Sequence, residues 1–437
     1  MAQVQACPGT TPAAPGRDMQ RAAMAGFVGS LMEWYDFFLF GTASALVFGK
    51  LFFPASSPEA GTLAAFATFA VGFISRPIGA VLFGHVGDRV GRKTALLATA
   101  LIMGLGTLAI GLLPTYDSIG VWAPVLLVLL RLLQGLGIGG EWGGASLVAL
   151  EHAPTGRRGF IGSLPQMGSP MGLLLSTLVF AVVSRMEPEN FLAWGWRVPF
   201  LLSAVFLVAA VYIRLAIAET PAFLKAKASG EQAAIPIVAL FRRHPKNIAL
   251  ATGARLADAV VFNVINVFGI AYAANTLHVE RGTMLSGFVI ASAVEVGILP
   301  LVGLLSDRVG RRPVYLAGVL LSGSFIFAYF PLLASGSMRL AWFAIVMALA
   351  VGTGLMFAIQ SSFFSELFGT GVRYTGISIG YQLSALIGGA PTPLIASALV
   401  LWAGGAWWPV AVYVAAVCAL SAVCVWLAAE THGSDLA

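Results

Sequence analysis

Eight ionisable side chains interrupt long apolar runs of this sequence, and they are the residues best placed to do chemistry. They are Glu33, Asp36, Arg76, Arg131, Glu141, Arg255, Asp258 and Glu295. A charged side chain within an apolar span costs about 2.5 to 3.5 kcal/mol on insertion scales, so it usually faces a protein interior or a polar cavity. Most of the eight precede residue 200, which places the predicted coupling chemistry in the first and fourth apolar runs.

Two carboxylates of the first run are three residues apart, so on a helix Glu33 and Asp36 share one face. Carboxylates close together in a low dielectric compete for a proton, whereas a nearby arginine favours their charged forms. We expect Asp36, assisted by Glu33, to bind the coupling proton and thereby free Arg131 for a substrate carboxylate. Glu141 would tune this site. The alternative is a permanent buried ion-pair network of the same side chains.

Two further groups of polar residues are candidates for binding substrate. Arg76 is either a second anchor for an anion or a structural partner of a carboxylate in the first run. A polar stripe within an arc of about 140° of one helix consists of Arg255, Asp258, Asn263 and Asn266. This stripe can contact substrate, although Arg255 and Asp258 can equally form an intrahelical pair.

Hydrogen-bonding side chains also lie within the apolar runs, and they suit the hydroxyls of a polar acid. The predicted contacts are Tyr35, Gln134, Gln166, Gln360, Tyr381 and Gln382. Each amide can instead satisfy a neighbouring helix, where such a bond is worth about 0.6 kcal/mol on average. The five histidines fall in or near loops and no cysteine spacing suits zinc, so we expect no metal and no cofactor. The proton is the expected coupling ion.

The composition requires a membrane around this chain. Of its 437 residues, 58% are hydrophobic and only 10% are charged, whereas soluble domains carry about 25% charged residues. Apolar runs of about 20 residues or more, the length of a crossing, are found at 22–48, 62–84, 94–113, 122–150, 159–184, 197–217, 248–274, 283–305, 314–334, 340–367, 374–402 and 406–428. The sequence therefore predicts an all-α integral membrane protein with twelve transmembrane helices.

A charged loop motif occurs twice, 219 residues apart (303 − 84). Residues 84–93 (GHVGDRVGRK) and 303–312 (GLLSDRVGRR) are identical at six of ten positions. Each copy follows the second apolar run of its half. The chain is therefore predicted to be a duplicated six-helix unit, and parallel six-helix repeats around a midplane site are a transporter architecture.

The repeated motif predicts a polar latch, because a carboxylate suits both helix N-termini and cations. Its members would be Gly84, Gly87, Asp88, Arg89, Gly91 and Arg92 in the first copy, and Asp307, Arg308, Gly310 and Arg311 in the second. We expect each aspartate to pair with both arginines of its copy in one alternating-access state. The alternative is simple anchoring of the topology by positive charge.

Most of the 25 Lys and Arg fall in loops on the side of the N-terminus, so the positive-inside rule predicts that both termini are cytosolic. This distribution also explains the net charge of +6 without nucleic acid. The predicted organisation is a disordered cytosolic tail (1–21), a six-helix bundle (22–218), a cytosolic linker (219–247), a second six-helix bundle (248–429) and a tail (430–437). Two pseudo-symmetric bundles need no protein partner to form one pathway, which predicts a monomer.

The repeated loop resembles the signature between the second and third spans of the major facilitator superfamily. Narrower matches to the metabolite:proton symporter family are residues 29–37 (GSLMEWYDF), 76–79 (RPIG), 131–144 (RLLQGLGIGGEWGG) and 194–200 (WGWRVPF). Members of this family import shikimate, 2-oxoglutarate, citrate, other organic acids, and proline or betaine. Residues 61–144 and 373–389 are most similar to its shikimate-transporting members.

The resemblance implies the major facilitator fold and a secondary active transporter of a bacterial inner membrane. We expect proton symport of a small organic acid, shikimate-like or another mono-, di- or tricarboxylate. The alternatives are import of a zwitterion such as proline or betaine, and proton-driven export, to whose motif residues 168–172 (GSPMG) are loosely similar. A membrane-embedded enzyme is disfavoured because the sequence holds no nucleophile constellation and no paired metal-ligating histidines.

Overall fold

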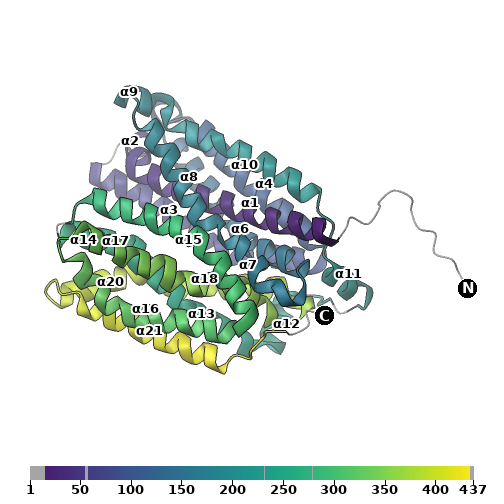
Figure 1. The fold of residues 1–437 in the computed structure, drawn as a ribbon. Helices are drawn as coiled ribbons and strands as arrows, with labels where there is room; N and C mark the ends of the chain where they lie inside the picture. The colour runs from purple at the N-terminus through teal and green to yellow at the C-terminus, as the bar shows by residue number, and fades with distance from the viewer. Residues whose placement is uncertain (1–14, 55–57, 231, 278, 434–437) are drawn as a thin grey trace, which may run out of the picture.

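The computed structural model describes residues 15–54, 58–230, 232–277 and 279–433. Within them, twelve helical segments are long and apolar enough to cross a membrane, and they coincide with the twelve apolar runs of the sequence (Figure 1). The prediction of an all-helical, twelve-span protein is confirmed. The first fourteen residues of the predicted N-terminal tail and residues 434–437 lie outside the described residues.

The N-terminal half contributes six spans, and the sixth is preceded by a π-helical turn (Phe191–Gly195). They are α1 (Pro15–Ala43) continued by a π-helical turn (Ser44–Phe48) and α2 (Gly49–Phe52), α3 (Pro58–Arg89), α4 (Arg92–Leu112), α6 (Trp122–Glu151), α7 (Arg158–Gln166) with α8 (Gly168–Val183), and α10 (Arg197–Leu215). Short helices between them are α5 (Tyr116–Ile119) and α9 (Pro188–Asn190).

The C-terminal half repeats this arrangement. Three of its spans are composite: α13 (Pro245–Asn263) continues through a π-helical turn (Val264–Phe268) into α14 (Gly269–Asn275), α17 (Met338–Val346) through a π-helical stretch (Met347–Thr353) into α18 (Gly354–Glu366), and α19 (Arg373–Ser384) through a π-helical turn (Ala385–Gly389) into α20 (Thr392–Trp402). The other three spans are the single helices α15 (Arg281–Val309), α16 (Arg311–Leu333) and α21 (Trp408–Leu427). Such π-helical turns often occur at functional sites.

The helix α3 illustrates how the spans expose apolar side chains on one face and bury a charged side chain on another. Its residues Ile74, Ile78 and Leu82 are 66%, 61% and 49% exposed and recur every four positions, so they form one outward apolar stripe. Arg76, between them in sequence, is only 9% exposed because it points away from this stripe. Helix periodicity thus keeps the charge inside the protein.

The two sets of six helices lie side by side in Figure 1. Across their boundary α7 packs on α15, and α3 packs on α19. The beginning of α1, the end of α21 and the connecting helices α11 (Pro221–Ala228) and α12 (Pro236–Arg243) lie at one end of the molecule. We call this end the loop end.

The segments expected to be a tail and a linker are more helical than their polarity suggests. Residues 15–21 belong to α1, because proline is compatible with a first helical turn. Within 219–247, α11, α12 and α13 each begin with a proline, and the Thr220 hydroxyl accepts a hydrogen bond from the Phe223 N–H at 3.4 Å. The segment predicted to be a linker therefore contains two short helices, α11 and α12.

Candidate functional site

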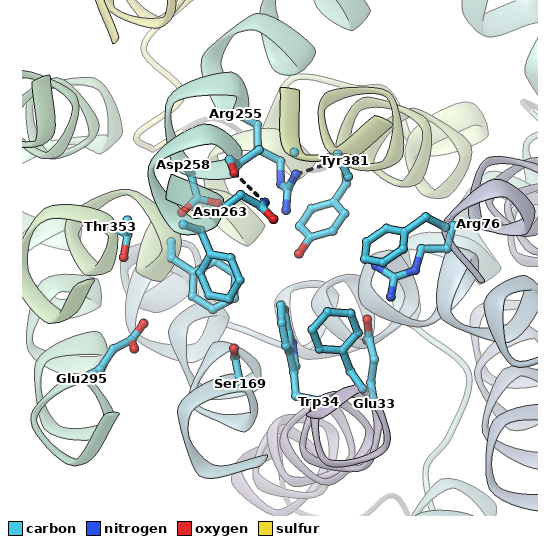
Figure 2. A pocket seen from close by; sticks show the side chains of 17 residues that line it. Glu33, Trp34, Arg76, Ser169, Arg255, Asp258, Asn263, Glu295, Thr353 and Tyr381 are labelled. Atoms are coloured by element: carbon cyan, nitrogen blue, oxygen red, sulfur yellow. Dashed lines mark hydrogen bonds between the residues drawn. The ribbon is translucent and has the colours of Figure 1, made fainter. Parts of the chain in front are cut away.

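A cavity lined by side chains of both halves lies between them (Figure 2). The N-terminal half lines it with Glu33, Trp34, Phe37, Phe73, Arg76 and Ser169. The C-terminal half lines it with Arg255, Asp258, Ala259, Phe262, Asn263, Glu295, Thr353, Phe357, Tyr381, Ala385 and Gly389. The predicted contacts that reach this cavity are Glu33, Arg76, Arg255, Asp258, Asn263 and Tyr381.

Helix α13 contributes most of one wall, and its spacing explains why. The lining positions follow one helix face at intervals of three, four, seven and eight residues from Arg255 to Asn263. Asn266 continues the predicted stripe, yet it donates to the Phe262 carbonyl of its own helix at 3.0 Å and is not a lining residue. The structure therefore places the first nine residues of the polar stripe in the cavity wall.

Arg76 is held in the cavity by aromatic rings. Its Cζ atom lies 4.1 Å from the centre of the Phe73 ring and 5.3 Å from that of Phe37. Although it is only 9% exposed, its Nε atom has no hydrogen-bond partner among the described residues. Cation–π contacts favour the charge without consuming its hydrogen-bonding edge, which leaves that edge for a ligand.

Arg255, from α13 of the C-terminal half, also packs on an aromatic ring. Its Cζ lies 3.4 Å from the centre of the Tyr381 ring, and its Nη1 donates to the Ser384 hydroxyl at 2.8 Å and to the Tyr381 carbonyl at 3.3 Å. Tyr381 in turn stacks on Trp142 of the N-terminal half, with ring centres 4.1 Å apart. The Arg255 Nε has no partner in the described part of the chain.

Three carboxylates share the cavity with these arginines. Glu33 and Asp258 are each 5% exposed, whereas Glu295 is half-buried. Among the described residues none of the three forms an ion pair within 4.0 Å, so the intrahelical pair of Arg255 with Asp258 is absent. The Glu33 Oε2 atom likewise has no hydrogen-bond partner within the described ranges. The charges of this site are left for a ligand or a proton.

The side chain of Asp36 points into the N-terminal bundle and away from the cavity lining. The Thr107 hydroxyl donates to Asp36 Oδ2 at 2.5 Å and accepts a hydrogen bond from Gln134 Nε2 at 2.8 Å. Gln134 Oε1 then accepts from Arg131 Nη1 at 3.3 Å. We call Asp36, Thr107, Gln134 and Arg131 the relay. It joins the predicted proton carrier to Arg131 through two neutral side chains instead of a direct ion pair.

Aromatic rings also support Arg131, whose Cζ lies 4.3 Å from the Phe40 ring centre and 4.9 Å from that of Phe69. Asp36 and Glu33 share a helix face, but the 60° between them is enough to direct one into the bundle and the other into the cavity. The expected carboxylate pair is therefore two separate sites.

Glu141 is an ion-pair partner in this structure. Its carboxylate contacts the Arg214 guanidinium and accepts a hydrogen bond from the Thr99 hydroxyl at 2.5 Å. Arg214 also donates to the Leu96 carbonyl. This buried pair joins α4, α6 and α10, which favours the structural alternative for Glu141 over its predicted tuning role.

The remaining candidates are buried outside the cavity lining. The Tyr35 hydroxyl donates to the Pro199 carbonyl at 2.8 Å, so its neighbour Trp34 reaches the cavity instead. Gln166 accepts from Trp142 Nε1 at 3.0 Å and donates to the Phe357 carbonyl at 3.1 Å, linking the two halves. Gln360 and Gln382 are 0% and 2% exposed within α18 and α19.

At the loop end, the two copies of the charged motif reach across the boundary between the halves. Asp88 accepts hydrogen bonds from the backbone N–H groups of Tyr374 and Thr375 at 3.1 and 3.0 Å, and from Arg92 at 2.9 Å. Arg92 Nε lies 3.6 Å from Glu151, and Arg92 Nη2 donates to the Thr370 carbonyl at 2.9 Å. The carboxylate sits at the N-terminus of α19, where it is stabilised by the helix dipole.

The second copy mirrors the first. Asp307 accepts from the N–H groups of Gly159 and Phe160 at 2.8 and 2.9 Å, at the N-terminus of α7, and from Arg311 at 2.9 Å. Arg311 Nε lies 3.5 Å from Glu366. We call Asp88, Arg92 and Glu151 with Asp307, Arg311 and Glu366 the junction network.

The expectation that each aspartate also pairs with the next residue is wrong. Arg89 is exposed and donates to the Ala234 carbonyl at 3.1 Å, and Arg308 is exposed. Each aspartate lies in the last turn of one helix and Arg92 or Arg311 is the first residue of the next, so the turn at Gly91 or Gly310 brings that arginine back onto the aspartate.

The glycines of the motif permit these contacts. A Cβ at Gly84 would lie 2.8 Å from the Thr375 hydroxyl, and one at Gly87 would overlap the Tyr374 ring. Gly91 and Gly310 have φ of 151° and 106°, a region that favours glycine. There Glu219 and Glu430 accept hydrogen bonds from the N-termini of α4 and α16.

Sequence reasoning missed the aromatic and hydroxyl lining of the cavity: Trp34, Phe37, Phe73, Ser169, Phe262, Thr353 and Phe357. Apolar residues are common everywhere in such spans, so only proximity to Glu33 or Arg76 in sequence could have indicated some of them. Glu295 stood out as a charge without a matching pattern. No group of metal-ligating side chains is present in the described part of the chain.

Comparison with known proteins identifies relatives over nearly the whole chain. Residues 22–239 match the family model described as sugar (and other) transporter. The chain is 40% identical to the shikimate transporter of Escherichia coli (strain K12), over 92% of this chain and 93% of that protein. It is 35% identical to the proline/betaine transporter of Salmonella typhimurium (strain LT2), over 87% of this chain and 78% of that protein.

A solved structure supports the same grouping. The fold is similar to that of the major facilitator superfamily proton:xylose symporter XylE bound to 6-bromo-6-deoxy-D-glucose, with a TM-score of 0.77 and 18% identity. The alignment covers 97% of this chain and 98% of that one. This likeness confirms the predicted fold class, and the matched proteins are transporters and not enzymes.

Proposed function

The chain belongs to the major facilitator superfamily, among its metabolite transporters, and from this premise we propose that it imports a small organic acid together with protons. The observation that carries the proposal is a pair of arginines in one cavity, Arg76 and Arg255, whose Nε atoms lack partners among the described residues. A guanidinium edge matches a carboxylate in geometry and charge. The acid binds between the two halves, with its carboxylate on these arginines.

The proton is carried by the relay. Asp36 Oδ1 is buried and has no hydrogen-bond partner among the described residues, while Oδ2 holds the Thr107 hydroxyl. Protonation of Asp36 removes the charge that attracts Arg131, and Thr107 and Gln134 transmit the change to its guanidinium. No cofactor and no protein partner is required, since the proton supplies the driving force and the lipid bilayer separates the two sides.

Alternating access follows from the junction network. Its contacts close the loop end in this conformation, so substrate enters from the other end and leaves after the network opens. Most basic residues lie in loops at the loop end, which supports a cytosolic location for both termini. We assign the protein to the inner membrane of a bacterium, as the bacterial relatives suggest.

One observation favours a zwitterionic substrate as the second candidate. The cavity contains three carboxylates as well as two arginines, and the rings of Trp34, Phe37 and Phe262 line it. Aromatic faces and carboxylates bind ammonium groups. A proline-like or betaine-like molecule would therefore also find partners for both its charges.

The proposal is tested by uptake into proteoliposomes under an imposed inward proton gradient. Shikimate, 2-oxoglutarate, citrate, benzoate, proline and betaine are compared with and without an uncoupler. We expect accumulation of an acid that the uncoupler abolishes, and expect Asp36→Asn to lose accumulation while retaining exchange of preloaded substrate. Accumulation of betaine in preference to every acid would support the second candidate, and efflux driven by the same gradient would refute import.

A further inference from the structure

The charges of the cavity are distributed unevenly along its length. Figure 2 shows Glu295 and Arg76 on opposite sides, with Asp258 on the Glu295 side of Arg255. Resting on the proposed function, we propose that Asp258 and Glu295 form a second subsite, which binds hydrogen-bond donors of the substrate at the end away from its carboxylate. We call it the donor subsite.

Glu295 is the strongest evidence for the donor subsite. Its side chain lines the cavity from α15 and is half-buried, yet it makes no hydrogen bond or ion pair with any described residue. A carboxylate within a membrane span is costly unless donors surround it. Since the described protein atoms supply none, the donors come from what enters the cavity.

A second, independent observation points to the same occupant. On the opposite side, Arg76 is only 9% exposed and Glu33 only 5% exposed, and both face the cavity with atoms that lack partners in the described part of the chain. A ligand that satisfies the arginines with a carboxylate spans the cavity toward Glu295. The donor subsite and the arginines together select a molecule with an acid at one end and donors at the other.

The donors are N–H or O–H groups, which an ammonium or a set of hydroxyls provides equally well. An acid that lacks both would leave Asp258 and Glu295 without partners on binding. A site built around such groups rejects analogues that lack the donor much more strongly than a hydrophobic pocket rejects a missing methylene. The donor subsite therefore determines specificity among acids of similar size.

The relay is separate from the donor subsite. Its carboxylate, Asp36, lies in the N-terminal bundle with Thr107 as partner, whereas Asp258 and Glu295 belong to α13 and α15 of the C-terminal half. Loss of the donor subsite should therefore change which acid binds while leaving proton coupling in place.

The experiment is equilibrium binding to the full-length purified protein by titration calorimetry, which requires no proton gradient. Two matched pairs are compared: shikimate with cyclohex-1-ene-1-carboxylate, which lacks the hydroxyls, and proline with cyclopentanecarboxylate, which lacks the amine. We expect the donor-bearing member of one pair to bind about tenfold more tightly or better than its partner. The pair that shows the preference identifies hydroxyls or an ammonium as the donors.

Variants assign this preference to residues. Glu295→Gln should reduce the ratio of the two affinities to near one by weakening the donor-bearing acid, and Asp258→Asn should reduce it in the same direction. Glu295→Asp keeps the charge and should retain part of the preference. Glu187→Gln removes an exposed carboxylate outside the cavity and should keep the full preference.

The outcomes separate this inference from the proposed function. If none of the four compounds binds, the donor subsite fails, and the organic-acid proposal fails with it only if no acid is accumulated in the proteoliposome test either. If the acids bind but donor-free acids bind equally well, or if Glu295→Gln retains the wild-type ratio, the donor subsite alone is refuted. If Glu295→Gln does not fold, the ratio of the two affinities is measured for the wild type and for Glu295→Asp, and these two ratios decide whether the donor subsite is refuted.

Discussion

The junction network and the cavity both contain buried arginines and carboxylates, but these side chains are paired with one another only in the junction network. At the loop end, Arg92 and Arg311 each lie within 4.0 Å of two carboxylates. One carboxylate of each pair, Asp88 or Asp307, also accepts hydrogen bonds from a helix N-terminus of the other half. In the cavity, Arg76 and Arg255 rest on aromatic rings and have no carboxylate within that distance among the described residues. Charges that the protein itself satisfies hold a conformation, whereas charges that it leaves unsatisfied bind ligands.

The largest effect is expected where the protein satisfies its own charges. Arg311→Ala leaves Asp307 and Glu366 without their cation, and removal of one partner of a buried pair costs about 3 to 5 kcal/mol. We expect a lower melting temperature and reduced yield in detergent, measured by thermal unfolding. Arg308→Ala, which removes an exposed arginine three residues earlier, is the control. Equal stability of the two variants would contradict the role given to the junction network.

In the cavity the same type of substitution should affect transport and not stability. Arg255→Ala removes one of the two arginines proposed to bind the substrate's carboxylate. The loss of two charge-assisted hydrogen bonds should reduce uptake about 100-fold. Because no protein carboxylate depends on Arg255 within 4.0 Å among the described residues, its melting temperature should stay close to that of the wild type. A lowered melting temperature together with normal uptake would contradict the ligand-binding role given to Arg255.

Substitutions of Ser384 test whether the position of Arg255, and not only its charge, contributes to substrate binding. Its hydroxyl accepts the Nη1 hydrogen bond at 2.8 Å, and loss of one such bond costs about 1 kcal/mol. We expect Ser384→Ala to raise the KM about fivefold with kcat unchanged, because the charge is retained. Ser384→Thr retains the hydroxyl and should restore the KM; an equal defect in both variants would argue against a hydrogen-bonding role.

The smallest effect concerns a cap of the junction. Burial opposes ionisation of Glu430, but hydrogen bonds from the N–H groups of Arg311, His432, Arg312 and Thr431 prevail and hold the pKa of its carboxyl below the ordinary value. Its stabilisation is therefore present at neutral pH and disappears as the pH falls below about 4.5, the ordinary value, and through the lower pKa of the folded state.

Since Glu430 is largely exposed, its cap contributes about 0.5 kcal/mol. Glu430→Gln should lower the melting temperature slightly at pH 7, and this difference should shrink as the pH falls below about 4.5. A difference between the two proteins that grows in acid would contradict this sign.

Much of the fold could be predicted because the relevant signals are local. A run of about 20 apolar residues identifies a span wherever it packs, and the duplicated motif identifies the repeat from two short segments. The candidate site was predicted less completely. Arg76, Arg255 and Asp258 were found because a charge in a span is rare, while Trp34 was missed and Tyr35 proposed in its place because both are aromatic neighbours on one helix.

Sequence alone determined the twelve spans, the repeat and the identities of the intramembrane charges, since hydropathy and spacing are properties of the chain itself. Only the tertiary structure decided which charges are partners. Helix periodicity sets the angle between Glu33 and Asp36, but the rotation of α1 against α4 and α13 directs one carboxylate to the cavity and the other to Thr107. Packing against helices distant in sequence determines this rotation, so the function of each charge depends on neighbours that its own segment does not specify.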